Sequence, residues 1–332
     1  MEEKQESIQV KKVFSRLGWC YLAGTVVVYG LQLLLGWFLG SYKAEWLENT
    51  NLVLILSEVT VYGCGMPFIL LLVSGMRKTV PERHHMKCWE FLAGFVICYA
   101  LVYVSNLVGT ICTYVIGTVK GSPVESGLVE YVTNGNMLLN FVLMVVIAPV
   151  VEEFVFRKVI VDRTLAYGQW AAVVVSGLMF GLFHGNLNQF AYAVVLGMFF
   201  AFLYIKTGNL KVTIGMHAIV NFMGGILSGL LMKGIHYDEF MEKNLSGDIE
   251  SMMSLMMEHI GPWIGFALYA VVLFVMVIAG IVLLIVFHRK FRLDHIDTEI
   301  PRGERFRLVF WNPGMVAFCA AWIVMIILQL FM

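Results

Sequence analysis

The sequence predicts an all-α fold, a polytopic transmembrane helical bundle with about eight or nine spans. Of the 332 residues, 59% are hydrophobic and only 14% are charged, whereas a soluble domain typically has about a quarter of its residues charged. Apolar runs of roughly 20 residues recur along the whole chain, and each can cross a hydrocarbon core of about 30 Å. Lysine plus arginine balances aspartate plus glutamate at 23 each, so the chain has no basic excess to attract nucleic acid. The partner that this composition predicts is the lipid bilayer.

Nine apolar runs are the candidate spans. The first is long and follows a polar, basic N-terminus, which favours a span over a cleaved signal peptide. In chain order the runs cover about 18–40, 52–75, 90–116, 137–156, 170–185, 189–206, 211–231, 260–287 and 314–332. They divide the chain into N-terminal membrane helices (1–136), a helical core that holds the candidate site (137–231), and an outer loop with C-terminal membrane helices (232–332). In the outer loop, the stretch IESMMSLMMEHI is typical of an interfacial helix.

The distribution of cations predicts the orientation of the chain. Alternate loops receive 19 of the 23 lysines and arginines, and the other side receives only Lys43, Lys120, Lys233 and Lys243. Cytoplasmic loops carry the excess of Lys and Arg in membrane proteins. We therefore expect a multi-pass protein with a cytoplasmic N-terminus, and nine spans would leave the C-terminus outside.

Few ionisable groups lie inside the predicted spans, and such groups are functional candidates because burying them in lipid is costly. They are Glu58, Glu152, Glu153, Arg157, His184 and His217, with Asn221 as a polar companion. Glu153 and Arg157 are four residues apart with the carboxylate first, the favourable order for an ion pair on a helix. Glu152 is rotated about 100° from Glu153 on a helix with about 3.6 residues per turn. Glu153 thus has a structural partner, and Glu152 is left for another role.

Two further stretches carry polar pairs. FGLFHGN places His184 one turn after Phe180, and HAIVN places Asn221 one turn after His217, so each pair shares a helix face. Together with Glu152, these residues can serve hydrolysis in two ways. Glu152 could act as general base on a water with help from His184, while His217 and Asn221 donate hydrogen bonds to an oxyanion. Alternatively, Glu152, His184 and His217 could bind Zn²⁺ with an open position for water; the one-helix HExxH signature is missing.

Each feature alone also has a simpler interpretation. A single histidine in a membrane helix is often a packed core residue, and EExxxR at a helix end could be a charged cytoplasmic cap. Glu58 is interpreted as a helix-packing carboxylate because no partner motif surrounds it. The depths of His184 and Glu152 in the membrane also conflict. If Trp170 marks the inner surface, His184 lies about 20 Å further along its helix, whereas Glu152 lies near the predicted inner end of its own helix. To meet Glu152, the fourth helix must continue past the membrane, or the fifth must begin above it.

Three stretches in order resemble the EExxxR, FxxxH and HxxxN motifs of the CAAX-protease and bacteriocin-processing (CPBP, or Abi) intramembrane proteases. They are APVVEEFVFR, FGLFH and TGNLKVTIGMHAIVN. The resemblance covers roughly residues 137–231, while the flanking helices show only a general membrane pattern. One departure is Lys158, where relatives often carry glycine after the arginine, and it bears on local helix packing.

The resemblance implies a role for each motif residue. It makes Glu152 the catalytic glutamate, His184 its partner, and His217 with Asn221 the oxyanion-side pair. Glu153, Arg157 and Phe180 support them. Family members have been labelled metalloproteases, whereas the mechanism implied for prenyl-protein relatives is glutamate-dependent and metal-free. We expect no cofactor, and zinc on Glu152, His184 and His217 is the alternative.

Our first hypothesis is a hydrolase of the bacterial cell membrane, an endopeptidase that cleaves a membrane-associated peptide or protein near the cytoplasmic face. An ion-coupled transporter or channel could use the same polar groups, but the chain has no internal repeat and only seven prolines. A non-proteolytic membrane scaffold or immunity factor is the third hypothesis. A prenylated C-terminal motif, a peptide pheromone, a bacteriocin leader or an envelope regulator would all suit the same site.

Overall fold

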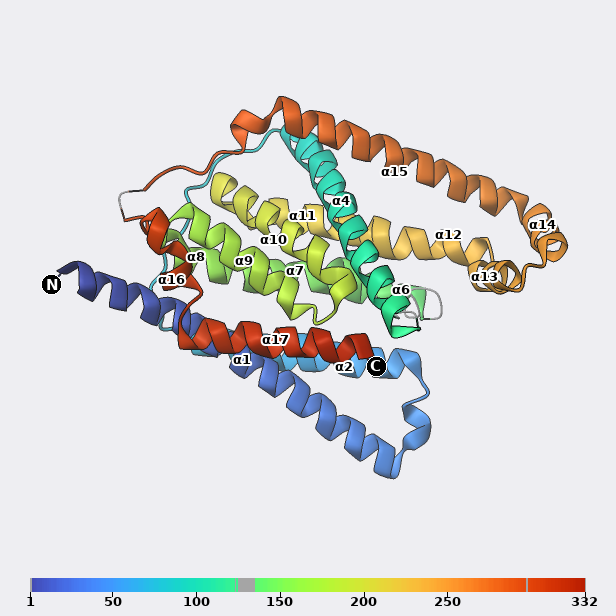
Figure 1. The fold of residues 1–332 in the computed structure, drawn as a ribbon, viewed down its shortest axis with the longest axis horizontal. Coiled ribbons are helices and arrows are strands. Elements are labelled where there is room, and N and C mark those ends of the chain that lie inside the picture. Colours follow the sequence, from blue (N-terminus) through green and yellow to red (C-terminus); the bar gives the residue numbers. More distant parts are fainter. Residues whose placement is uncertain (1, 123, 125–134, 297, 332) are drawn as a thin grey trace.

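Helices make up all the regular structure in the described part of the chain (Figure 1). The computed structural model describes residues 2–122, 124, 135–296 and 298–331. Within these ranges, eight helices are long and apolar enough to cross a membrane: Ser7–Tyr42, Thr50–Val73, Cys88–Lys120, Met137–Tyr167, Leu187–Thr207, Leu210–Gly234, Ile260–Val286 and Pro313–Phe331. The predicted all-α bundle of about eight or nine spans is confirmed, and the remaining predicted span corresponds to a shorter helix.

Five of these spans are built on uninterrupted α-helices, and three contain wider turns. The uninterrupted helices are α1 (Glu2–Tyr42), α4 (Cys88–Lys120), α10 (Leu187–Thr207), α15 (Ile260–Val286) and α17 (Pro313–Phe331). The second span joins α2 (Thr50–Glu58) to α3 (Met66–Val73) through a π-helical segment, Val59–Gly65. Another π-helical segment, Phe222–Leu227, joins α11 (Leu210–Asn221) to α12 (Ser228–Gly234).

The fourth span is longer than the sequence predicts. It runs from α6 (Met137–Asn140) through α7 (Ala148–Glu152) and α8 (Ile160–Thr164) to a last tight turn, Leu165–Tyr167, with π-helical segments at Phe141–Ile147 and Glu153–Val159. The predicted end at residue 156 is therefore wrong, and Glu152 is the middle residue of a helix of 31 residues.

The charges that suggested a helix end are satisfied inside the protein. Arg163 is buried and donates to the Val73 carbonyl from Nε at 3.1 Å and from Nη2 at 2.9 Å. Asp162 is also buried and accepts from the Tyr204 hydroxyl at 2.9 Å. The charged-cap interpretation of EExxxR is therefore wrong, and the conflict of depths is resolved by continuation of the fourth helix.

The shorter helix is α9 (Gln169–Phe183), whose 15 residues span about 22 Å at 1.5 Å per residue. This length falls short of a hydrocarbon core of about 30 Å. The chain turns at His184–Asn186 and returns as α10, which packs against α9 and α4. Glycines make the approach of α9 and α10 close: a Cβ at Gly177 would lie 2.8 Å from the Val194 carbonyl oxygen, and one at Gly181 would lie 2.9 Å from the Val194 nitrogen. Small residues at such crossings are typical of membrane helices.

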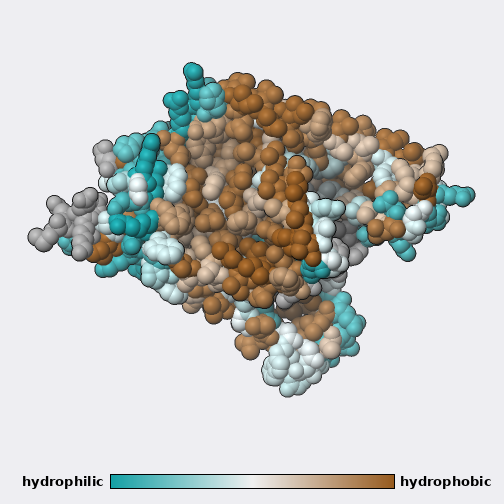
Figure 2. Space-filling view, in the orientation of Figure 1, coloured by the Kyte–Doolittle hydropathy of each residue, from teal (hydrophilic) through white to brown (hydrophobic). Residues whose placement is uncertain are grey.

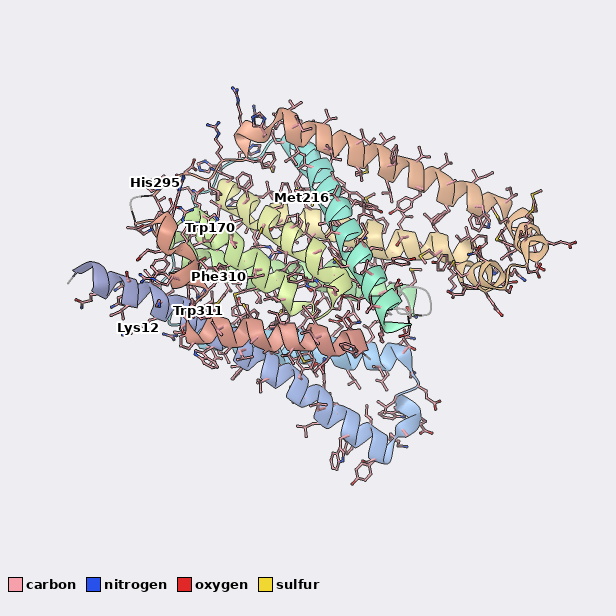
Figure 3. All side chains as sticks on the ribbon, viewed as in Figure 1. Lys12, Trp170, Met216, His295, Phe310 and Trp311 are labelled. Carbon is pink, nitrogen blue, oxygen red and sulfur yellow. The ribbon has the colours of Figure 1, made fainter. Side chains whose placement is uncertain are left out.

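The bundle has two polar ends and an apolar middle, which Figure 2 shows as a hydrophobic belt between hydrophilic ends. The N-terminus, the start of α9, the end of α10 and α16 (Arg305–Val309) gather at one end (Figure 1). Trp170, His295, Phe310 and Trp311 lie at that end as well (Figure 3). The opposite end holds α13 (Tyr237–Ser246) and α14 (Ile249–Glu258), which occupy the predicted outer loop. The cation-rich loops therefore share one end, and the cytoplasmic placement of that end stays a prediction, as does the division into three regions.

Candidate active site

A cavity of about 480 Å³ opens inside the bundle, and the motif residues meet around it. Five of them line its wall: Glu152, Phe180, His184, His217 and Asn221. They come from the middle of the fourth span, the last turn of α9 and the second half of α11. The continuation of the fourth helix places Glu152 at the depth of this cavity. Residues up to 69 positions apart in the sequence thus share one space.

Glu153 and Arg157 lie beside the cavity as a fully buried ion pair. The Nη2 atom of Arg157 is 3.1 Å from Oε1 of Glu153, and neither side chain is exposed. The guanidinium carbon also lies 4.2 Å from the centre of the Phe180 ring, a cation–π contact. The pair is the one that the four-residue spacing predicts. It fixes the fourth helix against α9 without reaching the cavity wall.

His217 connects the two adjacent glutamates. Its Nδ1 is 3.0 Å from Glu153 Oε1, and its Nε2 is 3.7 Å from Glu152 Oε2. The His217 side chain is only 4% exposed. One ring nitrogen thus contacts the buried carboxylate, and the other faces the carboxylate that lines the cavity at a distance beyond a direct hydrogen bond. The sequence interpretation placed His217 with Asn221, or with Glu152 and His184 in the zinc alternative, and missed its contact with Glu153.

Glu152 has a partner that the motifs do not include. The hydroxyl of Tyr62 donates to Glu152 Oε1 at 2.6 Å. Tyr62 lies in the π-helical segment of the second span and lines the same cavity, as does Glu58 one turn earlier. Sequence reasoning missed Tyr62 because a single tyrosine in an apolar run carries no spacing signal. The second span therefore contributes to the site.

His184 lies at the turn that follows α9. Its Nδ1 is 2.8 Å from the carbonyl oxygen of Phe180, and its ring meets the Phe180 ring edge-on, with 4.7 Å between centroids. A neutral imidazole that donates from Nδ1 to a carbonyl keeps Nε2 as an acceptor. Among the described contacts, His184 and Glu152 make no direct hydrogen bond, although both line the cavity.

Asn221 uses part of its amide within the fold. Its Nδ2 donates to the Met144 carbonyl at 2.8 Å, which ties α11 to the fourth span. A side-chain amide nitrogen carries two hydrogens, so one N–H of Asn221 is used by this bond and the second can serve a bound group.

Wide helical turns surround the site and supply free carbonyls. A π-turn breaks the regular i→i+4 pattern, and such turns are frequent at functional sites. Four carbonyls in these segments accept side-chain donors from other helices: Met144 from Asn221, Val155 from Tyr21 at 2.6 Å, Phe156 from Ser176 at 2.7 Å and Met223 from Tyr269 at 2.8 Å. The irregular turns thus hold the helices of the site in register.

The contacts of the candidate metal ligands bear on the zinc alternative. Among the described residues, no three His, Cys, Asp or Glu side chains are grouped as metal ligands. His217 directs one ring nitrogen at Glu153 and the other at Glu152 Oε2, 3.7 Å away. Tyr62 occupies Glu152 Oε1. The zinc alternative on Glu152, His184 and His217 stays a prediction, as does the expectation of no cofactor.

Comparison with known proteins agrees with the motif resemblance. The family described as Type II CAAX prenyl endopeptidase Rce1-like matches residues 134–223. YdiL of Bacillus subtilis (strain 168), a candidate membrane peptidase by name, is 26% identical over 172 residues, which cover 50% of this chain and 68% of YdiL. CAAX prenyl protease 2 of Homo sapiens is 34% identical over 100 residues, 24% of this chain and 30% of the human protein. No solved structure matches the chain.

The matched segment contains all seven motif residues, five of which line the cavity. The human relative is matched over less than a third of its length, whereas the match with YdiL covers half of this chain. The match, the order of the motifs and the eight apolar helices agree with one another. Residues 134–223 of this multi-pass membrane protein are thus similar to the Rce1-like family of CAAX prenyl endopeptidases.

Proposed function

We propose that the protein is a membrane-embedded endopeptidase that hydrolyses a peptide bond in a membrane-associated peptide or protein, with Glu152 activating the water. One observation carries the proposal: Glu152, His184, His217 and Asn221 line one cavity within the apolar part of the bundle. A general base needs a site within hydrogen-bond reach of its water and a substrate pose beside it. The cavity provides that space, and the family supports the reaction class.

In the proposed reaction, a water beside Glu152 attacks the carbonyl carbon of the substrate and gives its proton to Glu152. The tetrahedral oxyanion accepts hydrogen bonds from the second N–H of Asn221 and from His217 when that ring is protonated. The C–N bond then breaks, and Glu152 returns the proton to the leaving amine. His184, with Nε2 available as an acceptor, orients the water or relays the proton.

Two contacts position Glu152 and His217 for these roles. The Tyr62 hydroxyl holds one carboxylate oxygen at 2.6 Å, which leaves Oε2 to face the water. The buried pair of Glu153 and Arg157 holds His217 from behind through the 3.0 Å contact of Nδ1 with Glu153. In this scheme Tyr62, Glu153 and Arg157 are positioning residues, because they act through Glu152 and His217.

We further propose that the reaction needs no metal. The support is the use of the candidate ligands: Tyr62 occupies Glu152 Oε1, and Glu153 occupies His217 Nδ1. Elemental analysis of purified protein tests this part. One zinc per chain, lost in both His184→Ala and His217→Ala, would contradict it.

Cleavage of defined peptides by purified protein tests the proposal. A farnesylated C-terminal peptide and an unmodified leader-type peptide are incubated with wild type, Glu152→Gln and Glu242→Gln, each with and without a chelator. Glu242 lies in α13 and is exposed, so its substitution is a matched control for the change of charge. We expect cleavage of at least one peptide by wild type and Glu242→Gln and none by Glu152→Gln. Equal cleavage by Glu152→Gln would refute the assignment of the base.

A further inference from the structure

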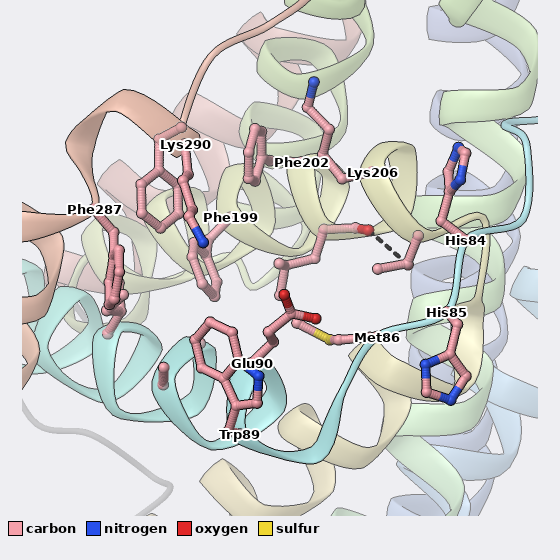
Figure 4. A pocket seen from close by; sticks show the side chains of 16 residues that line it. His84, His85, Met86, Trp89, Glu90, Phe199, Phe202, Lys206, Phe287 and Lys290 are labelled. Atoms are coloured by element: carbon pink, nitrogen blue, oxygen red, sulfur yellow. Dashed lines mark hydrogen bonds between the residues drawn. The ribbon is translucent and has the colours of Figure 1, made fainter.

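A second cavity, of about 300 Å³, lies apart from the candidate active site, at the cation-rich end of the bundle (Figure 4). It forms where α4 begins and where α10 and α15 end. Figure 4 shows Trp89 of α4, Phe199 and Phe202 of α10, and Phe287 after α15 around this space. Since three spans begin or end there, the cavity lies at a membrane surface.

The inner wall of this cavity is apolar. Gly94, Ile97 and Phe199 line it, and all three are buried. Gly94 lets the buried Met216 approach α4 closely, since the Met216 methyl would lie only 3.2 Å from a Cβ there. An apolar wall that leads inward from the surface suits a hydrocarbon chain.

The border of the same cavity carries basic side chains: Lys206, Lys290, His84 and His85. Lys290 Nζ lies 5.3 Å from the Trp89 ring centre and 5.1 Å from that of Phe287, and among the described contacts it has no carboxylate partner. Lys206 differs, because Asp294 lies 2.6 Å from its Nζ. The uncompensated cation at the border is therefore Lys290.

The single carboxylate among the lining residues does not neutralise Lys290. Glu90 accepts the backbone N–H of Lys87 at 2.9 Å, as part of the cap of α4. Its charge also lies in the first turn of that helix, where a carboxylate offsets the helix dipole. The border thus keeps a net attraction for an anion beside an apolar interior.

We propose that this cavity binds one molecule of an anionic phospholipid, with an acyl chain against Ile97 and Phe199 and the phosphate at Lys290. Charge complementarity and the position at the ends of three spans favour a lipid, because it presents both chemistries from the bilayer itself. Basic pockets between membrane helices are suited to anionic headgroups. Binding there would join α4, α10 and α15 at the surface, on the far side of α10 from α9.

Lipid with brominated acyl chains tests the proposal, because bromine quenches nearby tryptophan and Trp89 lines the cavity. Full-length protein is titrated with brominated phosphatidylglycerol or brominated phosphatidylcholine in mixed micelles. The variants are Lys290→Gln, which removes the proposed phosphate contact, and Ala93→Phe, which fills the apolar part. Lys211→Gln is the control, since Lys211 is exposed and does not line the cavity. Trp89→Phe identifies the share of quenching that comes from this site.

We expect phosphatidylglycerol to quench at lower concentration than phosphatidylcholine, and Trp89→Phe to lose that component. Lys290→Gln should weaken phosphatidylglycerol about fivefold, as removal of about 1 kcal/mol per cation predicts, and Lys211→Gln should not. Ala93→Phe should weaken both lipids. Equal affinity of the two lipids, or equal effects of Lys290→Gln and Lys211→Gln, would overturn the proposal. The proposal would also be overturned if inorganic phosphate displaced the brominated lipid as effectively as unbrominated lipid does, because the site would then bind a soluble anion.

Discussion

The two adjacent glutamates should respond in opposite ways to the same isosteric change. Glu153→Gln removes a carboxylate whose Oε1 lies 3.1 Å from Arg157 Nη2 and 3.0 Å from His217 Nδ1, with no exposed side-chain surface. It leaves the Arg157 guanidinium buried without its counter-charge, and such a loss typically costs about 3–5 kcal/mol. In Glu152→Gln, the amide oxygen can still accept from Tyr62, and the original side chain is 16% exposed to the cavity. We expect a cost of at most about 1 kcal/mol there.

Thermal unfolding of purified protein in one detergent measures the difference. A gap of about 3 kcal/mol corresponds to a Tm roughly 5–10 °C lower for Glu153→Gln than for Glu152→Gln, from the scaling for large domains. Peptide cleavage gives the complementary result, with no turnover in Glu152→Gln and reduced turnover in Glu153→Gln. Equal Tm values for the two variants would refute the reasoning on the buried pair, and so would a larger loss of stability in Glu152→Gln.

Three further predictions concern other parts of the molecule. Tyr62→Phe should lower kcat with little change in KM, because Tyr62 acts through Glu152. The control is Tyr21→Phe, which removes a buried hydroxyl outside the cavity and should lower Tm while leaving kcat of the folded protein unchanged. Asn221→Ala should fold and should turn over about 10²–10³ times more slowly, and kinetics with Tm on the same sample check both; wild-type kcat would contradict it. A cysteine at position 245 should react with a membrane-impermeant reagent from outside the cell, and labelling only after permeabilisation would contradict the predicted orientation.

Hydropathy predicts most of the fold, because chain length and apolar composition limit what can cross a bilayer. The fourth span shows where this reasoning fails. Asp162 and Arg163 look like the charges of a helix end, yet they are buried against partners from other helices. Their partners lie up to 90 residues away in the chain, and no local pattern contains them.

The candidate site was predicted in part. Spacing in the sequence gave the order of the motifs and the pair of Glu153 with Arg157, because both depend on neighbours within one helix. The contact of Tyr62 with Glu152 depends on how the second span packs against the fourth. The π-helical segments were not predicted either, since the side chains that bond their carbonyls come from distant helices. The roles of Glu152, His184, His217 and Asn221 in the reaction stay predictions.

If Glu152 is the catalytic base that we propose, its central position in the 31-residue helix sets a length requirement for the substrate. Half of a hydrocarbon core is about 15 Å, and an extended chain advances about 3.3–3.6 Å per residue. A peptide entering from the surface therefore needs roughly five extended residues before its scissile bond can reach the carboxylate. A peptide bond next to a folded domain would be out of reach. A peptide bond within a stable transmembrane helix could be cleaved only after that helix had unwound locally. In this scheme, the depth of Glu152 would select substrates by the length of their extended segment, before any side chain of the substrate is recognised.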